Sequence, residues 1–379
     1  MATACVSASL GTCASYSICK CVTSKCFLSD EVAKGLYLFF LFIWSSIASL
    51  LQHFGEPLII HYEWGGVSID KTLCDQECMG DQSVYRISFA LFSFYASWGI
   101  LSLITKGTTH NSYWVGKFIN LLIFVLTTPF LPFDFINAWV VVCKYASVIF
   151  MLLQSCMLID FGYTFNDKLV SMGGNSWKAG ILTMCASMYT LMFCILFISY
   201  TNLSHAIMIL FVNIGMTGLS ILVPHGTLLT SAIVSLQTAY IPLISMHPSS
   251  GLSAVLGGFL AAGSLVYTAH STSKTNIFNI EPPAPKRESL EQIIMGDEYS
   301  EENDTSVLIK NVEERRKTIH FYDLILVFAS MYMPMVLTGF GAVQGTPELG
   351  PAIISQVLCA LLYSWTLVAP MAFPSRDFS

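Results

Sequence analysis

Runs of about twenty apolar residues recur along almost the whole chain, and no other feature limits its possible folds so strongly. An α-helix rises about 1.5 Å per residue, so a run of this length crosses a hydrocarbon core of about 30 Å. Backbone polar groups in lipid must be hydrogen-bonded within the protein, and barrel strands would instead alternate over about ten residues. The sequence therefore predicts an all-α integral membrane protein.

Ten such runs predict about ten transmembrane helices. The composition agrees, because 11% of the residues are charged, against about 25% in soluble domains. Helix ends are predicted to within a few residues. The expected spans are 35–51, 85–104, 113–131, 135–159, 177–200, 206–223, 226–245, 251–270, 321–340 and 351–371.

The distribution of basic residues tests this count and gives an orientation. Ten spans put both termini on one side of the membrane, and if that side is the cytosol, fifteen of the 18 Lys and Arg residues lie on the cytosolic side. Lys71 and Arg86 fall outside it, and Lys144 lies within a span. This separation follows the positive-inside rule. We therefore expect a multi-pass protein with both termini in the cytosol, in the endoplasmic reticulum, the Golgi or the plasma membrane.

The prediction divides the chain into five parts. They are a cytosolic Cys-rich N-terminus at 1–34, helices one to eight at 35–270, an acidic mobile cytosolic loop at 271–320, helices nine and ten at 321–371, and a cytosolic tail at 372–379. The loop is rich in acidic residues, Pro, Ser and Lys, a composition typical of segments that bury no core. It is interpreted as a solvated tether or, alternatively, as a sorting or phosphorylation segment.

Two groups of cysteines suggest covalent modification. Cys19, Cys21 and Cys26 precede the first span on the expected cytosolic side and are candidates for S-palmitoylation. Their spacing does not repeat a CxxC pair, which argues against zinc. Cys74 and Cys78 lie in the expected luminal loop, where an oxidising compartment favours a disulfide. Two thiols without a nearby His make a poor metal site.

The sequence has one further modification motif and lacks the common catalytic and nucleotide-binding motifs. Asn202 begins an Asn-Leu-Ser glycosylation sequon in an expected luminal loop. The chain has no Walker A loop, no GxGxxG, no HExxH and no GxSxG, and no basic stripe typical of nucleic-acid binding. We therefore expect no enzymatic activity, no cofactor, no metal and no nucleic-acid partner.

Charged residues inside spans are the main functional candidates, because each costs about 2.5 kcal/mol or more in lipid. Lys144 and Asp160 are sixteen residues apart, about 24 Å along one helix and nearly half a turn out of phase, so they cannot neutralise each other. The helix that holds them, 135–168, would be about 50 Å long and must tilt or project from the membrane. Lys144 is interpreted either as part of a path for lipids or ions, or as a residue that snorkels or pairs with Asp134.

Two further charges stand at the expected ends of spans. Arg86 opens the second span and Asp323 opens the ninth, and both are interpreted as anchors at the membrane interface. Pro242 and Pro334 lie within spans, where proline frees backbone carbonyls and kinks the helix. Such kinks are compatible with a polar pathway.

Several segments together resemble the serine incorporator family, over essentially the whole chain. The most specific is the C-terminal YSWTLVAPMAFPSRDFS, which is similar to the family's ending of Trp-Thr-Leu-Val-Ala-Pro followed by Arg-Asp-Phe. The others, in chain order, are the Cys-rich N-terminus, SVYRISFALFSFY, LLQSCMLIDFGYTFNDKLV and FYDLILVFASMYMPMVLTGF.

The resemblance implies ten helices in two bundles separated by a long diagonal helix, here 135–168, and assembly into oligomers. Asp160 and Asn166 fall on the family's Ile-Asp-Phe and Trp-Asn positions, with Phe165 replacing the Trp, and are added to Lys144 and Asp134 as candidates for a polar pathway. Asp323 stands where the family frequently has His. The implied activity is ATP-independent phospholipid scrambling, support of phosphatidylserine and sphingolipid synthesis, or both.

The leading hypothesis is therefore a lipid-handling protein in which a tilted helix with polar groups guides headgroups while the acyl tails stay in lipid. One alternative is a secondary transporter of serine or another small polar solute. Another is an oligomeric scaffold that recruits lipid-synthesis enzymes. Membrane phospholipids, further copies of the chain and those enzymes are the expected partners.

Overall fold

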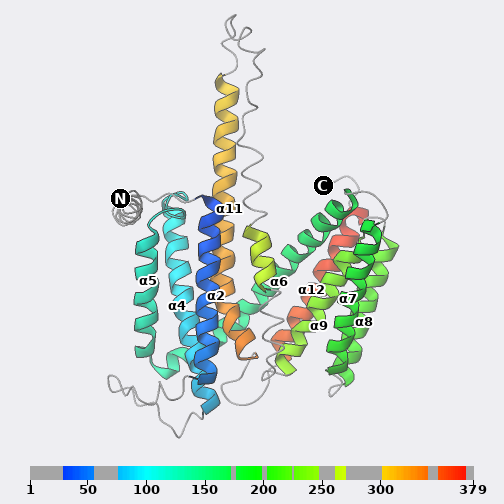
Figure 1. Cartoon of the computed structure of the whole chain (residues 1–379), viewed down its shortest axis with the longest axis horizontal. Helices are drawn as coiled ribbons and strands as arrows, with labels where there is room; N and C mark the ends of the chain where they lie inside the picture. Colours follow the sequence, from blue (N-terminus) through cyan, green and yellow to red (C-terminus); the bar gives the residue numbers. More distant parts are fainter. Residues whose placement is uncertain are drawn as a thin grey trace, which may run out of the picture. The chain divides into compact units, whose positions relative to one another are not determined.

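The computed structural model describes residues 29–54, 76–171, 176–198, 203–223, 226–246, 261–269, 301–339 and 349–372. Every regular element in these residues is helical, as the apolar runs predicted. The labelled helices in Figure 1 are α2 (Asp30–Phe54), α4 (Gln76–Ile104), α5 (Trp114–Thr127), α6 (Phe133–Ser171), α7 (Ser176–Ile198), α8 (Leu203–Leu222), α9 (Leu228–Met246), α11 (Glu301–Leu337) and α12 (Leu349–Ala372). A 3-10 turn, η1 (Thr128–Phe130), follows α5, and residues 261–269 are also helical.

The helices match the expected spans in position, although they differ in length. Within the described residues, six helices are long and apolar enough to cross a membrane, and they lie in α2, α4, α6, α7, α11 and α12. Three expected spans correspond to shorter apolar helices, at Trp114–Phe130, Ile207–Leu222 and Leu228–Tyr240. The structure therefore supports a multi-pass helical membrane protein.

Two helices begin well before the expected spans. α4 starts at Gln76 rather than at 85, inside the expected luminal loop. α11 starts at Glu301 rather than at 321, so that residues 301–319, expected in the mobile loop, are helical. The sequence of this stretch, EENDTSVLIKNVEERRKTI, explains the difference. It contains no Gly or Pro, the two residues that most disfavour a helix.

The chain forms two compact units. Unit 1 comprises the described parts of 1–44, 89–129 and 268–327, and unit 2 comprises those of 45–88, 130–267 and 328–379. The resemblance implied a long helix that separates two bundles. Here α6 lies wholly within unit 2, where it packs against α7, α9 and α12.

Unit 2 is organised around α9, which contacts α6, α7, α8 and α12. Most described residues of α9 are buried, including polar ones such as Thr230 and Gln237. Gly162 of α6 permits the close approach of the two helices, because a Cβ there would lie 2.7 Å from Oγ1 of Thr230. Small residues at such crossings let membrane helices pack backbone against backbone.

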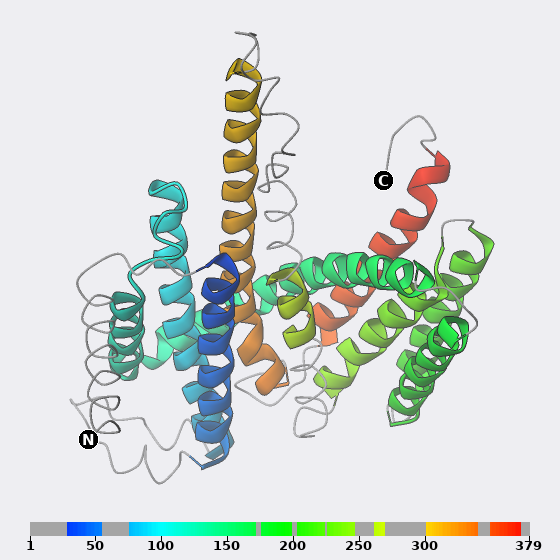
Figure 2. The same cartoon turned by 45° about the horizontal axis from the view of Figure 1, so that its top comes forward.

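α6 is the longest element, with 39 residues, and would be about 58 Å long at the usual helical rise. It is one continuous helix, and Figure 2 shows its C-terminal half most clearly. Its sequence contains no proline, which would remove a hydrogen bond and break the helix. Asp134 lies in its first turn and Lys168 in its last, each with the sign that the helix dipole favours. The predicted long fourth helix is thus present.

The core of unit 1 is aromatic. Tyr37 of α2 lies 6.3 Å from Phe94 and 6.1 Å from Tyr95 between ring centroids, and 5.0 Å from Trp114 of α5. The buried hydroxyl of Tyr95 donates a hydrogen bond to the carbonyl of Tyr37 at 2.8 Å. Tilted ring pairs at these distances stabilise a core beyond their buried area, and they join α2, α4 and α5.

Candidate functional site

The exposed face of α6 changes character halfway along the helix. Exposed residues recur every three or four positions, which places them on one side of a helix. In the first half they are mainly apolar, namely Phe135, Ala138, Val142, Tyr145 and Ile149. In the second half the exposed residues on this side are Cys156, Asp160, Thr164, Asp167 and Ser171, which we call the α6 stripe, and Lys168 and Val170 are exposed beside them. The stripe covers fifteen residue steps, or about 22 Å of helix axis.

Asp160 is the central charge of the α6 stripe. The hydroxyl of Tyr267, in the helical residues 261–269, donates a hydrogen bond to Oδ2 of Asp160 at 2.6 Å. Oγ1 of Thr164 lies 3.3 Å from the same hydroxyl oxygen. The sequence predicted Asp160 as part of a polar pathway, but its tyrosine partner, 107 residues further along the chain, gave no signal.

Aromatic rings flank this carboxylate. The ring of Phe161 meets that of Tyr267 edge to face, with centroids 5.1 Å apart. Phe161 also stacks on Phe165 at 5.4 Å. Asp160 is therefore an exposed carboxylate that accepts one hydrogen bond from Tyr267, and the ring of Tyr267 in turn contacts Phe161.

The other predicted pathway residues do not join the α6 stripe. Lys144 is half-buried, sixteen positions before Asp160 and about 160° around the helix, as its spacing implied. Asn166 is also half-buried and lies about 120° away from Asp160. Asp134 is exposed in the first turn of α6, ten residues from Lys144 on the same helix. This spacing is about 15 Å along the axis, so the helix geometry does not favour the alternative in which Lys144 pairs with Asp134.

Arg86 and Asp323, expected as interface anchors, both have partners within the protein. Nη1 of Arg86 donates to the carbonyl of Leu131 at 2.9 Å, which fixes the turn between η1 and α6. Asp323 is 8% exposed, inside unit 1, and its Oδ1 lies 2.9 Å from Nδ1 of His110. Because α11 begins at Glu301, Asp323 is in the middle of a helix rather than at its end. The expected position of Asp323 at the end of a helix is therefore corrected.

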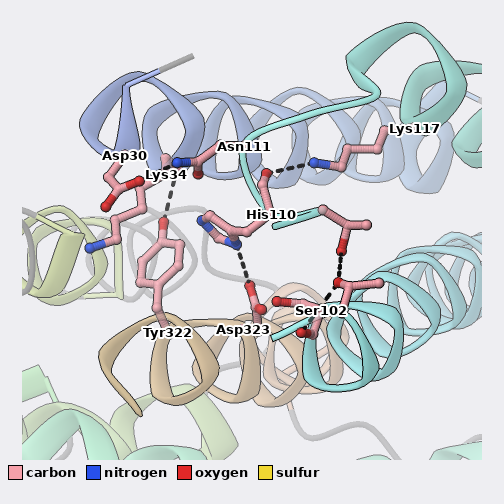
Figure 3. A network of polar contacts seen from close by, with 10 residues as sticks. Asp30, Lys34, Ser102, His110, Asn111, Lys117, Tyr322 and Asp323 are labelled. Atoms are coloured by element: carbon pink, nitrogen blue, oxygen red, sulfur yellow. Dashed lines mark hydrogen bonds and ion pairs between the residues drawn. The ribbon is translucent and has the colours of Figure 1, made fainter. Parts of the chain in front are cut away.

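Asp323 belongs to a polar network that Figure 3 shows. The network joins α2, the turn between α4 and α5, α5 itself and α11. We call it the unit 1 network, and its members are Asp30, Lys34, His110, Asn111, Lys117, Arg315, Tyr322 and Asp323.

Asp30 receives the largest number of donors in this network. Nε and Nη2 of Arg315 reach its two carboxylate oxygens at 2.8 and 2.6 Å, in the parallel geometry that favours guanidinium–carboxylate pairs. The side-chain amide of Asn111 also donates to Asp30. The first turn of α2 is thereby tied to α11 and to the α4–α5 turn.

Lys117 is a fully buried cation. Its Nζ donates to the carbonyl of His110 at 2.6 Å. The ring centroids of Trp114, Tyr37 and Trp98 lie 4.1, 5.0 and 5.3 Å from the same nitrogen. Aromatic faces stabilise a desolvated ammonium, and the carboxylate of Asp323 in the same network adds a favourable charge interaction. The sequence did not single out Lys117, although a charge inside the expected span 113–131 was the available signal.

The α4–α5 turn that carries His110 and Asn111 is held by its own polar residues. Gly107 has a φ of 86°, which favours glycine because it has no Cβ. The hydroxyls of Thr105 and Thr109 are 2.8 Å apart, and that of Ser112 donates to the carbonyl of Thr108 at 2.9 Å. These contacts turn His110 and Asn111 into the interior, where both are buried.

Several predicted modification sites lie outside the described residues. They are Cys19, Cys21, Cys26, Cys74 and Asn202, and the side chain of Cys78 also falls outside. Palmitoylation, a Cys74–Cys78 disulfide and glycosylation of Asn202 therefore stay predictions. Among the described residues, no group of three or more His, Cys, Asp or Glu is placed to hold a metal ion.

Comparison with known proteins identifies the family. The family model described as serine incorporator (Serinc) matches residues 5–376. A probable serine incorporator of Nematostella vectensis is 25% identical, over 81% of this chain and 82% of that protein. Serine incorporator 3 of Bos taurus is 24% identical, over 97% of this chain and 98% of its own length. Because the family model covers nearly the whole chain, this protein belongs to the serine incorporator family.

Proposed function

We propose that this protein moves phospholipids between the two leaflets of a membrane without ATP, along the α6 stripe. The supporting observation is that an apolar helix, long enough to cross the bilayer, has an exposed stripe of about 22 Å whose residues from Asp160 to Ser171, about 16 Å, are mainly polar. Half of a hydrocarbon core of about 30 Å is about 15 Å. The stripe is therefore longer than the apolar part of one leaflet when α6 stands upright.

The physical reason is the cost of moving a charged headgroup through hydrocarbon. Polar and charged side chains exposed at membrane depth are expensive, by about 2.5 kcal/mol or more for a charge, and therefore generally serve a function. The α6 stripe offers a headgroup hydroxyls and carboxylates in place of water, while the acyl chains stay in lipid beside the helix. Its end at Asp167 and Ser171 is the cytosolic end in the expected topology, which makes the cytosolic leaflet the side of entry.

A tilt of α6 is part of the proposal. At about 58 Å the helix is roughly twice as long as the hydrocarbon core is thick, so it tilts or projects. Tilting brings the apolar half of its exposed face and the α6 stripe into different leaflets. The stripe then guides a headgroup through one leaflet, and the crossing of the other is the slower step.

The test is scrambling in liposomes. The purified protein is reconstituted with an acyl-labelled NBD phospholipid, and dithionite is added outside. Empty liposomes lose only outer-leaflet fluorescence, whereas vesicles with the protein should lose inner-leaflet fluorescence too. No loss beyond that of empty liposomes would contradict scrambling.

The α6 stripe itself is tested by making it apolar. The double variant Asp160→Leu, Thr164→Val should slow scrambling by about tenfold or more, since tenfold corresponds to only about 1.4 kcal/mol. Thr190→Val is the matched control, because Thr190 is an exposed threonine on α7 whose hydroxyl bonds to its own helix at Ala186. An unchanged rate in the double variant would remove the stripe from the pathway and leave scrambling to another surface.

One observation favours the solute-transporter alternative. Ser235 and Gln237 of α9 and Gln356 of α12 are at most 2% exposed. Oγ of Ser235, Oε1 of Gln237 and both side-chain atoms of Gln356 have no hydrogen-bond partner among the described residues. Polar atoms buried in this way occur along solute and proton paths in membrane bundles. Uptake of labelled serine into the same proteoliposomes separates this function from scrambling, and co-purification of lipid-synthesis enzymes would support the scaffold instead.

A further inference from the structure

We propose that Asp160, Tyr267 and the adjacent rings form a binding site for the ammonium group of amine-bearing phospholipid headgroups. The inference rests on the proposed scrambling, since it names the headgroup that the α6 stripe selects. The chemical class comprises zwitterionic lipids and others that carry a primary or quaternary ammonium. Lipids with uncharged glycerol or inositol headgroups lack this group.

The charges along α6 favour a cation at this position. Asp160 and Asp167 are the two charges of the α6 stripe, and both are negative. The next cation towards the C-terminus of α6 is Lys168, eight residues from Asp160 or about 12 Å along the axis, and Lys144 is about 24 Å away in the other direction. An ammonium is therefore attracted to Asp160, whereas a bare phosphate is repelled.

The contacts at Asp160 leave the carboxylate able to accept a second donor. Within the described part of the chain, the Tyr267 hydroxyl is the donor that reaches it, through Oδ2. Asp160 is exposed, so a lipid headgroup has access to the remaining acceptor positions. A carboxylate has about four such positions and forms its strongest hydrogen bonds with charged donors.

The aromatic rings extend the site to quaternary ammonium groups, which cannot donate a hydrogen bond. The ring of Tyr267, whose hydroxyl bonds to Asp160, contacts that of Phe161, and Phe161 stacks on Phe165 further around α6. Ring faces attract a desolvated cation whether or not it carries N–H bonds. Carboxylate and rings together therefore suit both ethanolamine-type and choline-type headgroups.

The next turn of the stripe suits the phosphate that follows the ammonium in such a headgroup. Thr164 lies four residues beyond Asp160, about 6 Å along the axis. Its hydroxyl can donate to a phosphate oxygen, and one further turn along the helix the positive charge of Lys168 offsets the negative charge of the adjacent Asp167. The site thus orients the headgroup along the stripe with the ammonium innermost.

A purely structural role for the Tyr267–Asp160 hydrogen bond is the rival explanation, and two variants separate it from binding. Asp160→Asn keeps an acceptor for Tyr267 but removes the charge. Tyr267→Phe keeps the charge and the ring but removes the hydrogen bond. Ammonium binding predicts the larger effect from Asp160→Asn, whereas a structural link predicts the larger effect from Tyr267→Phe, with a lowered melting temperature.

The experiment compares two acyl-labelled NBD lipids with identical chains, a phosphatidylcholine and a phosphatidylglycerol, in the dithionite assay. Asp160→Asn should lower the rate at which phosphatidylcholine is scrambled by about tenfold, the usual order for one charge-assisted contact. The rate for phosphatidylglycerol should fall by less than about twofold. Glu31→Gln, which neutralises an exposed carboxylate on α2, is the control and should change neither rate. Equal slowing of both lipids by Asp160→Asn would overturn the inference and leave scrambling intact.

A binding measurement keeps the two proposals distinguishable. Native mass spectrometry of the detergent-solubilised protein, titrated with the unlabelled forms of the same two lipids, should show preferential binding of the phosphatidylcholine, and Asp160→Asn should abolish the preference. If the preference is present but no lipid is scrambled, the ammonium site stands and the proposed function fails. If Asp160→Asn leaves the preference unchanged, the ammonium site is wrong whatever the scrambling result.

Discussion

The unit 1 network and the α6 stripe of unit 2 place their charged side chains differently. In the unit 1 network the charges are turned inwards and partnered within the protein, as with Asp30 and Arg315, or Lys117 and its three rings. On α6 in unit 2, Asp160 faces outwards with one tyrosine hydroxyl as its donor. Burial with matched partners fixes a conformation, while exposure leaves hydrogen-bonding capacity for something outside the chain. The contrast separates polar groups that hold the fold from polar groups available for function.

The largest effect on stability is expected from a substitution of Asp30. Asp30→Ala removes the acceptor of Arg315 and Asn111, and we expect a loss of about 2 kcal/mol in stability. That is below the 3–5 kcal/mol typical of a broken buried pair, because the Arg315 side chain is 41% exposed. The measurement is the thermal unfolding of the protein in detergent.

The neighbouring Glu31 supplies the control for this substitution. Glu31 is exposed in the same turn of α2, so Glu31→Ala should leave the melting temperature nearly unchanged. Scrambling by Asp30→Ala, measured below its melting temperature, should match that of the unaltered protein. A stable Asp30→Ala protein that scrambles slowly would show that the unit 1 network belongs to the functional machinery, against the contrast drawn here.

A smaller effect is expected where α6 meets α9. Gly162→Ala places a Cβ 2.7 Å from Oγ1 and 3.1 Å from Cα of Thr230. Overpacking of this kind costs about 1–3 kcal/mol, partly offset by the higher helix propensity of alanine. We expect a net loss of about 1 kcal/mol in thermal unfolding. Gly180→Ala, where no atom lies within 4 Å of the new Cβ, should instead be neutral or slightly stabilising, and equal effects at both positions would contradict this account of the contact.

The smallest effect is expected at Lys117, despite its complete burial. Lys117→Met keeps the length and apolar volume of the side chain inside the aromatic cage. It loses the hydrogen bond to His110 and the attraction of the three rings, but it also removes the cost of burying a charge. We expect a change of about 1 kcal/mol or less, measured by thermal unfolding beside Lys117→Ala, which should be clearly less stable because it leaves a cavity. A large loss for Lys117→Met would show that the charge itself stabilises unit 1.

Local patterns predicted the helices better than the partners of their polar residues. The length of the apolar run at 135–168 predicted α6, because helix formation in lipid depends on the residues of the run itself. The start of α11 at Glu301 was not predicted. A helix that extends beyond the membrane is rich in charged residues, and a mobile loop has a similar composition. The pairing of Arg315 with Asp30 spans 285 residues, and that of Tyr267 with Asp160 spans 107. Contacts between residues this far apart in the chain depend on how the helices pack, so local sequence patterns do not predict them.

The lack of space for a Cβ at Gly162, where it would lie 2.7 Å from Oγ1 of Thr230, has a consequence for the evolution of the chain. Since the space beside the α6 backbone is taken up by the Thr230 side chain, neither position can gain volume unless the other loses it. The two positions should therefore change together. In related sequences, a larger residue at the position of Gly162 should be accompanied by a smaller one at that of Thr230, and Thr230→Gly should act as a second-site suppressor of Gly162→Ala.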